Sequence, residues 1–193
     1  MASSSARALT RSSARRYSPE GDTLAVGSHD NNIYLVETRT YTRRNVCKGH
    51  SSFITHIDWS TDSKWLQSNC GAYELLFWTS KSGKQNKNPS ALKDVMWHTW
   101  TCVLGWPVQG IFSGGRGGSD IDSCVKVGNN LVVGGDDGMV SLYRYPCLKK
   151  EGSRKAYSGH SSHVTNVCAG HDNGHVYSVG GLDRALLQFA VSK

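Results

Sequence analysis

The sequence has little of what marks a membrane-spanning or disulfide-linked protein. Its 193 residues contain only four prolines, and no apolar stretch approaches the roughly 18 residues that a membrane span needs. Its six cysteines lie 21 to 32 residues apart, so no C-x-x-C pair is present. Single, scattered cysteines are typical of buried thiols in an intracellular protein. The sequence therefore argues against both a membrane-spanning segment and a disulfide framework.

Catalytic and cofactor-binding motifs are also lacking. The pairs His160-x-x-His163 and His171-x-x-x-His175 have spacings found in metal sites, but no cysteine pair accompanies them. The glycine-rich run 114–118 has no Walker lysine and no helical pattern after it. The sequence therefore predicts no enzyme activity, no cofactor and no metal site.

A group of tryptophans could suggest a nucleic-acid platform. Trp97, Trp100 and Trp106 lie within ten residues of one another, and aromatic side chains can stack on bases. Packing within a sheet protein accounts for them better. We therefore expect no nucleic-acid partner.

What the sequence does contain is an internal repeat. The segment Gly-His-Ser-Ser-Phe-Ile-Thr-His at 49–56 returns as Gly-His-Ser-Ser-His-Val-Thr-Asn at 159–166, with five of eight positions identical. An aromatic residue, Trp78 or Phe189, follows 28 or 29 residues after the histidine of each copy. This spacing is typical of one blade of a β-propeller. We therefore predict an all-β fold, a WD-repeat β-propeller of about four blades.

Four units fit this template, with third strands that end at Val36, Trp78, Tyr143 and Phe189. The spacings between these residues are 42, 65 and 46, so the middle unit carries an insertion of about 20 residues relative to the usual repeat of roughly 40–45. The predicted blades are a partial blade at 17–48, a blade at 49–93, a blade with a Trp-rich insertion at 94–158, and a final blade at 159–193 without its outer strand.

The strand count limits how these units can be completed. The template begins only at Tyr17, so the first unit is expected to lack its opening strand, and the four units together supply 14 strands. A closed seven-bladed ring needs about twice that number. We expect a partial ring or arc, completed by missing upstream residues or by another chain. The lesser alternative is four blades that close by pairing the two partial units.

Each blade of this type can be held by a staple, a hydrogen bond from a histidine to an aspartate in the turn between the second and third strands. The template places the aspartate six residues before the end of the third strand, where the second unit has Ala72, so His50 is predicted to lack such a partner. The fourth unit has Val179 where a hydroxyl group often completes the network. The predicted staple residues are His50, His160, Asp30, Asp137 and Asp183.

Several segments resemble one family, the echinoderm microtubule-associated protein-like family. They are Gly-His-Ser-Ser-Phe-Ile-Thr-His-Ile-Asp-Trp-Ser at 49–60, Trp-His-Thr-Trp-Thr-Cys-Val-Leu-Gly at 97–105, Asp-Ile-Asp at 120–122, Tyr-Pro-Cys at 145–147 and Gly-His-Ser-Ser-His-Val-Thr-Asn-Val at 159–167. The resemblance runs from about Tyr17 to the C-terminus. It implies a tandem double propeller that associates with microtubules, of which this chain matches the last part of the second propeller. The chain departs from the family pattern at Ala72, at Phe189, where tryptophan is expected, and throughout residues 1–16.

Positive charge is unevenly distributed along the chain. The net charge is +7, and residues 1–16 contribute four arginines with no acidic residue. We interpret this segment as a basic disordered arm or a misassigned start, with an organellar transit peptide as the alternative. The other basic residues gather in connections, where they could face an acidic partner such as tubulin or could simply be solvated. The candidates for partner binding are Arg43, Arg44, Lys81, Lys84, Lys87, Lys93, Lys149, Lys150, Arg154 and Lys155.

Two classes of function remain open at this point. The first is a non-enzymatic, microtubule-associated structural protein of the cytoplasm and cytoskeleton, or more narrowly of the ciliary axoneme. Its partners would be tubulin and neighbouring microtubule-associated proteins. The second is a generic WD-repeat adaptor in a signalling or ubiquitin-ligase complex, which would hold a short peptide on a propeller face. Neither class requires a nucleic-acid or membrane partner.

Overall fold

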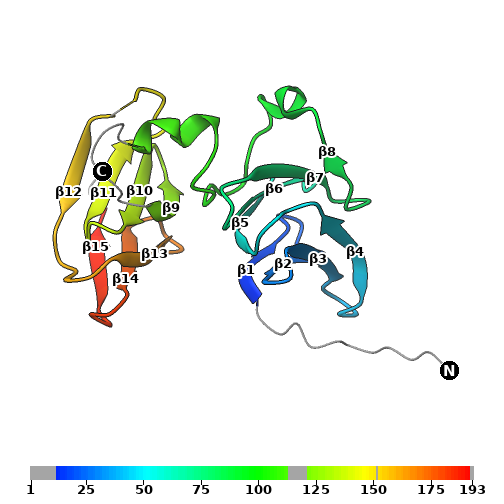
Figure 1. The fold of residues 1–193 in the computed structure, drawn as a ribbon, viewed down its shortest axis with the longest axis horizontal. Coiled ribbons are helices and arrows are strands. Elements are labelled where there is room, and N and C mark those ends of the chain that lie inside the picture. Colours follow the sequence, from blue (N-terminus) through cyan, green and yellow to red (C-terminus); the bar gives the residue numbers. More distant parts are fainter. Residues whose placement is uncertain (1–11, 113–120, 151, 192–193) are drawn as a thin grey trace. The chain divides into compact units, whose positions relative to one another are not determined.

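The computed structural model describes residues 12–112, 121–150 and 152–191, and these residues form an all-β protein (Figure 1). The chain divides into two compact units, residues 1–98 and 99–193. Each unit contains two antiparallel sheets in which strands that follow one another in sequence are hydrogen-bonded neighbours. This arrangement confirms the predicted fold class, four consecutive propeller-type blades. The glycine-rich run 114–118 lies outside the described residues.

Unit 1 holds two four-stranded sheets. The strands of the first sheet are β1 (Ser12–Tyr17), β2 (Thr23–Ser28), β3 (Asn32–Glu37) and β4 (Arg43–Lys48), and those of the second are β5 (Ile54–Trp59), β6 (Trp65–Cys70), β7 (Leu75–Thr79) and β8 (Gln85–Asn86). A short 3-10 helix, η1 (Pro89–Leu92), follows β8.

Unit 2 holds one four-stranded and one three-stranded sheet within the described residues. The 3-10 helix η2 (Trp106–Ile111) precedes them. The strands are β9 (Ile121–Val127), β10 (Asn130–Gly135), β11 (Val140–Arg144) and β12 (Arg154–Tyr157), and then β13 (Val164–Ala169), β14 (His175–Gly180) and β15 (Leu186–Ala190). The last sheet therefore has three strands, as the repeat pattern predicts.

The prediction that the first blade lacks its opening strand is wrong. Residues 12–17 form β1, which pairs with β2 through Arg15 opposite Val26 and Arg16 opposite Ala25. The described strands therefore number 15, not 14. The interpretation of residues 1–16 as a disordered arm fails for residues 12–16. The polar composition of this strand hides its role, because β1 is held mainly by its backbone and by Ala14, which packs on the core.

Neighbouring sheets within each unit pack face to face through two glycines at matching positions. In unit 1, β1 and β2 contact β5, and in unit 2, β9 and β10 contact β13. An added Cβ atom at Gly27 of β2 would lie 2.6 Å from Cγ2 of Ile54, and one at Gly134 of β10 would lie 2.6 Å from Cγ1 of Val164. A larger residue at either position would push the next sheet away.

The two units have cores of different composition. The core of unit 1 is built around two fully buried tryptophans, Trp59 and Trp78, with aliphatic side chains from both sheets. One core cluster of unit 2 consists of seven valines, which lie at 125, 127, 132, 140, 164, 167 and 176. Both sets follow from the alternation of inward and outward residues along each strand. Because β-branched and aromatic side chains fill such sheets well, both cores suit the strands that carry them.

The Trp-rich insertion is divided between the two units. In unit 1, His98 donates a backbone hydrogen bond to the carbonyl of Trp59 at 2.8 Å, and the Trp97 ring contacts Phe77. In unit 2, the indole of Trp100 is buried and donates to the carbonyl of Cys102 at 2.8 Å. Trp106 is 71% exposed. Blade packing therefore accounts for Trp97 and Trp100, whereas Trp106 lies on the surface.

Candidate functional site

The best-defined polar site of unit 1 is a chain of hydrogen bonds that crosses the second blade. His50 lies just before β5, and its Nδ1 is 3.0 Å from Oε2 of Glu74. Its Nε2 is 2.7 Å from Oγ of Ser68 on β6. The same Ser68 oxygen accepts a hydrogen bond from Nε1 of Trp78 at 2.8 Å. These four side chains connect the loop before β5 to β6 and β7.

The prediction that His50 has no acidic partner is therefore wrong. Ala72 does occupy the expected turn position and is exposed, but Glu74 reaches the same place from two residues further along. Its side chain is one methylene longer than that of aspartate, which makes up for the different position. Like the aspartate of the fourth blade, Glu74 also accepts a hydrogen bond from the backbone of the residue after the histidine, Ser51, at 3.0 Å.

The protonation states of this network follow from its surroundings. The hydrogen bond from the Ser51 backbone, followed by those from the Cys70 thiol, the Ser51 hydroxyl and His50, lowers the pKa of Glu74 to about 2. Burial lowers the pKa of His50, although Glu74 opposes this shift. At neutral pH a neutral imidazole therefore donates from Nδ1 to a carboxylate, and its Nε2 accepts from the Ser68 hydroxyl.

The fourth blade carries the matching staple with its histidine, hydroxyl and carboxylate members. His160 Nδ1 lies 2.9 Å from Oδ2 of Asp183, as predicted, and its Nε2 lies 2.7 Å from Oγ of Ser178. The expectation that Val179 leaves the staple partial is wrong, because the hydroxyl comes from the preceding residue, whose side chain points to the opposite face of the strand. Phe189 replaces the tryptophan of the second blade and has no N–H group to donate to this serine.

Two predicted staple residues have other partners within the described part of the chain. The carboxylate of Asp30 accepts from the Tyr34 hydroxyl and the Asn32 backbone. The carboxylate of Asp137 accepts from the Met139 backbone at 3.0 Å and lies 3.5 Å from a guanidinium nitrogen of Arg154. Both residues therefore stabilise a turn rather than a histidine staple.

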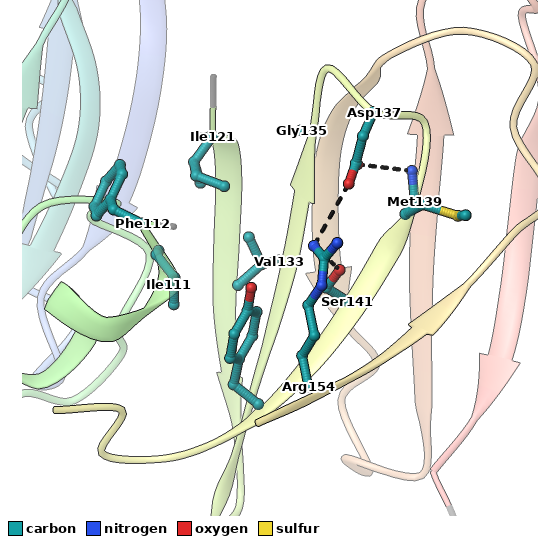
Figure 2. A pocket seen from close by; sticks show the side chains of 10 residues that line it. Ile111, Phe112, Ile121, Val133, Gly135, Asp137, Met139, Ser141 and Arg154 are labelled. Carbon is teal, nitrogen blue, oxygen red and sulfur yellow. Dashed lines mark hydrogen bonds and ion pairs between the residues drawn. The ribbon is translucent and has the colours of Figure 1, made fainter. Parts of the chain in front are cut away.

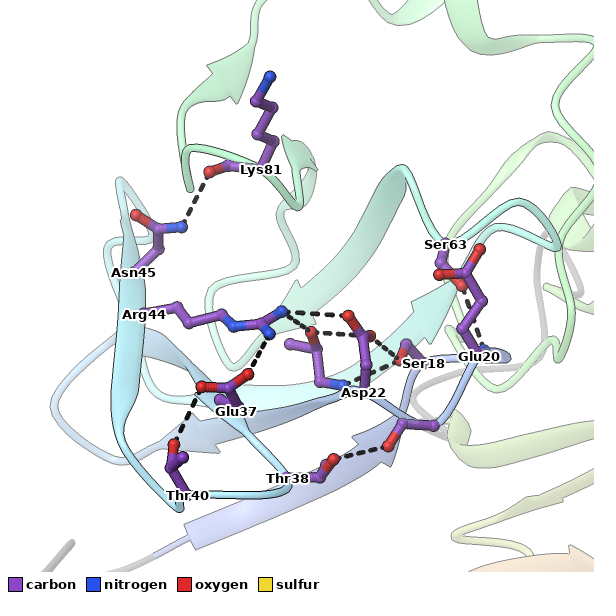
Figure 3. Close-up of polar contacts among 12 residues, drawn as sticks. Ser18, Glu20, Asp22, Glu37, Thr38, Thr40, Arg44, Asn45, Ser63 and Lys81 are labelled. Atoms are coloured by element: carbon purple, nitrogen blue, oxygen red, sulfur yellow. Dashed lines mark hydrogen bonds and ion pairs between the residues drawn. The ribbon is translucent and has the colours of Figure 1, made fainter.

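The basic candidates fall into two groups, and the first is tied into the blades. Arg44 on β4 makes ion pairs with Asp22 at 3.1 Å and Glu37 at 2.6 Å (Figure 3). Hydrogen bonds from Arg44, and then from Thr40, lower the pKa of Glu37. Arg154 on β12 donates to Ser141 at 3.1 Å as well as contacting Asp137. These two arginines therefore cross-link strands of their own blades.

The second group consists of seven lysines and Arg43, all exposed to solvent. Among the described residues, none of these lysines has a carboxylate within 4.0 Å of its ammonium group, although Lys81 receives a hydrogen bond from Asn45 at its backbone oxygen (Figure 3). No acidic residue occurs between 80 and 93. The exposed candidates are Lys81, Lys84, Lys87, Lys93, Lys149, Lys150 and Lys155, together with Arg43.

The cavity beside Arg154 is small. It has a volume of about 60 Å³ and lies within unit 2, between Ile111, Ile121, Val133 and Tyr143, with Arg154 and Asp137 at its polar side (Figure 2). Sites for small organic ligands are typically about 300–1,000 Å³. This cavity therefore gives no support for a small-molecule substrate.

All six cysteines are free, and five of them are buried. Burial raises the pKa of the Cys47 thiol to about 12, so this side chain behaves as an apolar core residue. Cys168 alone is exposed. In the described residues, no helix has the length and apolar character required to cross a membrane.

Successive antiparallel sheets, each following the last along the chain, with histidine staples in two of them, define a WD-type β-propeller. The chain belongs to the echinoderm microtubule-associated protein family: the sequence model of that family's second β-propeller matches residues 5–191. This match begins upstream of Tyr17, so the N-terminal boundary expected from the sequence is too late.

Known relatives agree with this family. The chain is 47% identical over 184 residues to echinoderm microtubule-associated protein-like 4 of Xenopus laevis, with 92% of this chain and 20% of the relative covered. It is 46% identical over 182 residues to the 77 kDa echinoderm microtubule-associated protein of Lytechinus variegatus, with 91% and 27% covered. The chain thus spans about a fifth to a quarter of the length of these relatives.

A solved structure supports the fold alone. The β-propeller domain of Cps50 (Swd1) from Myceliophteria thermophila matches with a TM-score of 0.69 and 17% sequence identity, over 94% of this chain and 65% of that domain. At this identity the likeness concerns the arrangement of blades and carries no functional statement.

Proposed function

We propose that this chain is a non-enzymatic, microtubule-associated structural protein that binds tubulin through exposed connections of its blades. The main support is the family: relatives that are 46–47% identical to more than nine-tenths of this chain are named for microtubule association. The finer part of the proposal is the surface that makes the contact.

The observation that carries this finer part is the lysine-rich connection that follows β7, residues 80–93, which includes the two-residue strand β8 and the short helix η1. Residues 80–93 contain four exposed lysines and no acidic residue. In the described structure these lysines have no carboxylate within 4.0 Å, unlike Arg44 and Arg154. Because their charges are not compensated locally, they remain available to an acidic partner. Tubulin is such a partner, since its surface and tails are strongly acidic.

Many exposed lysines spread over a connection suit a polymer surface better than a single ligand. Each lysine is a flexible point charge that contributes to long-range attraction and to the rate of encounter. None of them lines either of two cavities in the described part of the chain. The family and this charge distribution together favour microtubule association over the adaptor role.

The location that follows is the cytoplasmic cytoskeleton. A narrower proposal places the protein on the doublet microtubules of a cilium, where neighbouring microtubule-associated proteins would be further partners. Shallow contacts between a rigid propeller and a lattice would suit that position. Immunolocalisation in ciliated cells, compared with non-ciliated cells, tests this narrower proposal separately.

Copelleting with taxol-stabilised microtubules tests the central proposal. The 193-residue chain should appear in the pellet with microtubules and remain in the supernatant without them. The pelleted fraction should fall as salt is raised from about 50 to 200 mM, because contacts between exposed charges are screened over a Debye length of about 10 Å at 0.1 M. Binding that is absent at low salt would refute the proposal.

A further inference from the structure

A cluster of three potential metal ligands lies at the staple of the second blade. A ring nitrogen of His50, Sγ of Cys70 and a carboxylate oxygen of Glu74 all lie within 4.8 Å of one another. No C-x-x-C pair points to this cluster in the sequence, and the histidine pairs noted in the sequence are not part of it. The three residues come together because the hairpin between β6 and β7 faces the loop before β5.

The geometry around Glu74 is close to what a bound cation needs. Its Oε2 atom accepts three hydrogen bonds, from His50 Nδ1 at 3.0 Å, from the backbone of Ser51 at 3.0 Å and from Cys70 Sγ at 3.1 Å. Zinc–ligand distances of about 2.0–2.3 Å place tetrahedral ligands roughly 3.2–3.8 Å apart. Only small shifts are therefore required to place an ion between these three side chains, where the hydrogen atoms on His50 Nδ1 and Cys70 Sγ now point to Oε2 of Glu74.

The three ligand atoms favour zinc over calcium and magnesium. Imidazole nitrogen, thiolate sulfur and carboxylate oxygen are all ligands of zinc, and the sulfur disfavours calcium and magnesium, which prefer oxygen alone. The His50 side chain is 1% exposed and Cys70 is 3% exposed, whereas the Glu74 side chain is 32% exposed. The cluster is thus closed on two sides and open to solvent through Glu74, which supplies an entry path.

A supporting residue is already in place behind the cluster. Nε2 of His50 lies 2.7 Å from Oγ of Ser68. When Nδ1 binds a metal, the ring proton must reside on Nε2, and Ser68 can then accept it, because its oxygen can also receive the Trp78 N–H. A hydrogen-bond acceptor on the far nitrogen is a regular feature of metal-binding histidines.

The fourth blade provides an internal comparison. Cys70 is the register partner of Ile54, and the matching partner of Val164 is Gly180. The fourth blade therefore has the same histidine, serine and carboxylate as the second blade but no thiol. A hydrogen-bonded staple does not require a cysteine, so Cys70 is a separate feature that the staple alone does not explain.

We propose that His50, Cys70 and Glu74 form a zinc-binding site in the second blade, with water as the fourth ligand. Binding replaces the thiol proton of Cys70, which passes to solvent, and no electron transfer takes place. The bound ion would hold the loop before β5 to the β6–β7 hairpin more firmly than the hydrogen bonds alone. This proposal is independent of microtubule binding.

Isothermal titration of the metal-free 193-residue chain with zinc chloride tests the site, and cobalt chloride serves as a spectroscopic probe. Wild type should bind one zinc ion at this site, and cobalt should give a thiolate-to-metal charge-transfer band. The variant C70G, which copies the fourth blade, should lack that band and bind zinc at least about 100-fold more weakly. S68A, which removes the supporting acceptor, should bind about 10–100-fold more weakly.

Matched controls separate this site from other zinc binding and from unfolding. C168S removes the one exposed thiol and should leave the cobalt band unchanged. C70S keeps the size of the side chain in case C70G does not fold, and circular dichroism checks both. A wild-type chain without a thiolate–cobalt band overturns the proposal. So does a band that survives C70S or disappears in C168S.

Discussion

The imidazole of His50 and the carboxylate of Glu74 are joined by a 3.0 Å contact, although the chain has alanine where an acidic partner of this histidine is expected. The matching contact in the fourth blade joins His160 to Asp183 at 2.9 Å. The two blades therefore reach the same hydrogen-bond pattern with carboxylates from different positions in the turn.

Removal of the Glu74 carboxylate should destabilise unit 1. E74A leaves the buried His50 Nδ1–H without its acceptor, which should lower the free energy of unfolding by about 1–3 kcal/mol. A72D is the matched control. Because the histidine already has a partner, an added aspartate two residues away should give no gain of similar size. Urea melts followed by tryptophan fluorescence measure both variants. Equal stability of E74A and wild type would show that this contact contributes nothing.

Acid should destabilise the protein in two steps, each of which lowers the free energy of unfolding. Burial lowers the pKa of His50 and takes that of His56 to about 4. In the unfolded chain the pKa of histidine is near 6.5, so the unfolded state binds protons at a higher pH than the folded state does. Stability is therefore lost as the pH falls below 6.5. The pKa of Glu74, about 2 in the folded state against 4.5 ordinarily, adds a further loss below pH 4.5.

Urea midpoints measured between pH 3 and 8 test this pH dependence, with E74Q as the comparison. The variant should keep the loss that begins near pH 6.5 but show a shallower decline below pH 4.5. The slopes of wild type and E74Q should therefore separate most strongly in the acidic part of the range. Identical profiles throughout would contradict the assignment of the lower step to Glu74.

Substitution of Gly27 should force two neighbouring sheets apart. In G27A the new methyl group meets the branched Ile54 side chain at 2.6 Å inside the core, which should destabilise the protein by about 1–3 kcal/mol. The control is G71A, where the added atom also approaches to 2.6 Å, but against the ring of Phe53, which is 40% exposed and can turn away. In thermal melts the melting temperature of G71A should be well above that of G27A. A reversed order would contradict the packing argument.

Charge reversal of the lysine-rich connection should weaken microtubule binding. Replacement of Lys81, Lys84, Lys87 and Lys93 by glutamate should reduce copelleting and flatten its salt dependence, because the attraction to an acidic surface becomes a repulsion.

The comparison for this charge reversal is replacement of Arg154 and Lys155 by glutamate, which should reduce copelleting less. Circular dichroism must accompany that variant, because Arg154 also holds Asp137 and Ser141 in its own blade. Unchanged affinity and unchanged salt dependence in the four-lysine variant would remove the electrostatic mechanism.

The repeat pattern was sufficient to predict the fold, because a blade depends on local contacts. Alternating apolar residues, turns and the recurring Gly-His-Ser-Ser segment all act within one sheet. The same pattern predicted the pairing of His160 with Asp183, since both residues belong to one blade. It missed β1 because Ser12–Tyr17 has no apolar alternation of its own. This strand is held by backbone pairing with β2, which no residue pattern reports.

The staple of the second blade shows why a fixed spacing in the sequence cannot by itself identify a hydrogen-bond partner. The template considers one position, Ala72, but a hydrogen bond depends on where an oxygen atom lies, and a longer side chain reaches that point from Glu74. The sequence also did not show which basic residues are held by ion pairs and which are free to bind a partner. Arg44 and Lys84 look alike in the sequence, yet only Arg44 has carboxylates beside it, supplied by β3 and by the turn before β2.

The sequence by itself therefore determined the class of fold, the family and the order of the blades, because these depend on patterns that repeat along the chain. The tertiary structure decided which side chains meet. It brought Glu74 and Cys70 to His50, tied Arg154 to Asp137, and left the lysines of residues 80–93 exposed. Such contacts form between segments that turns and sheet twist bring together, and the distances between their atoms are set by packing rather than by spacing in the sequence.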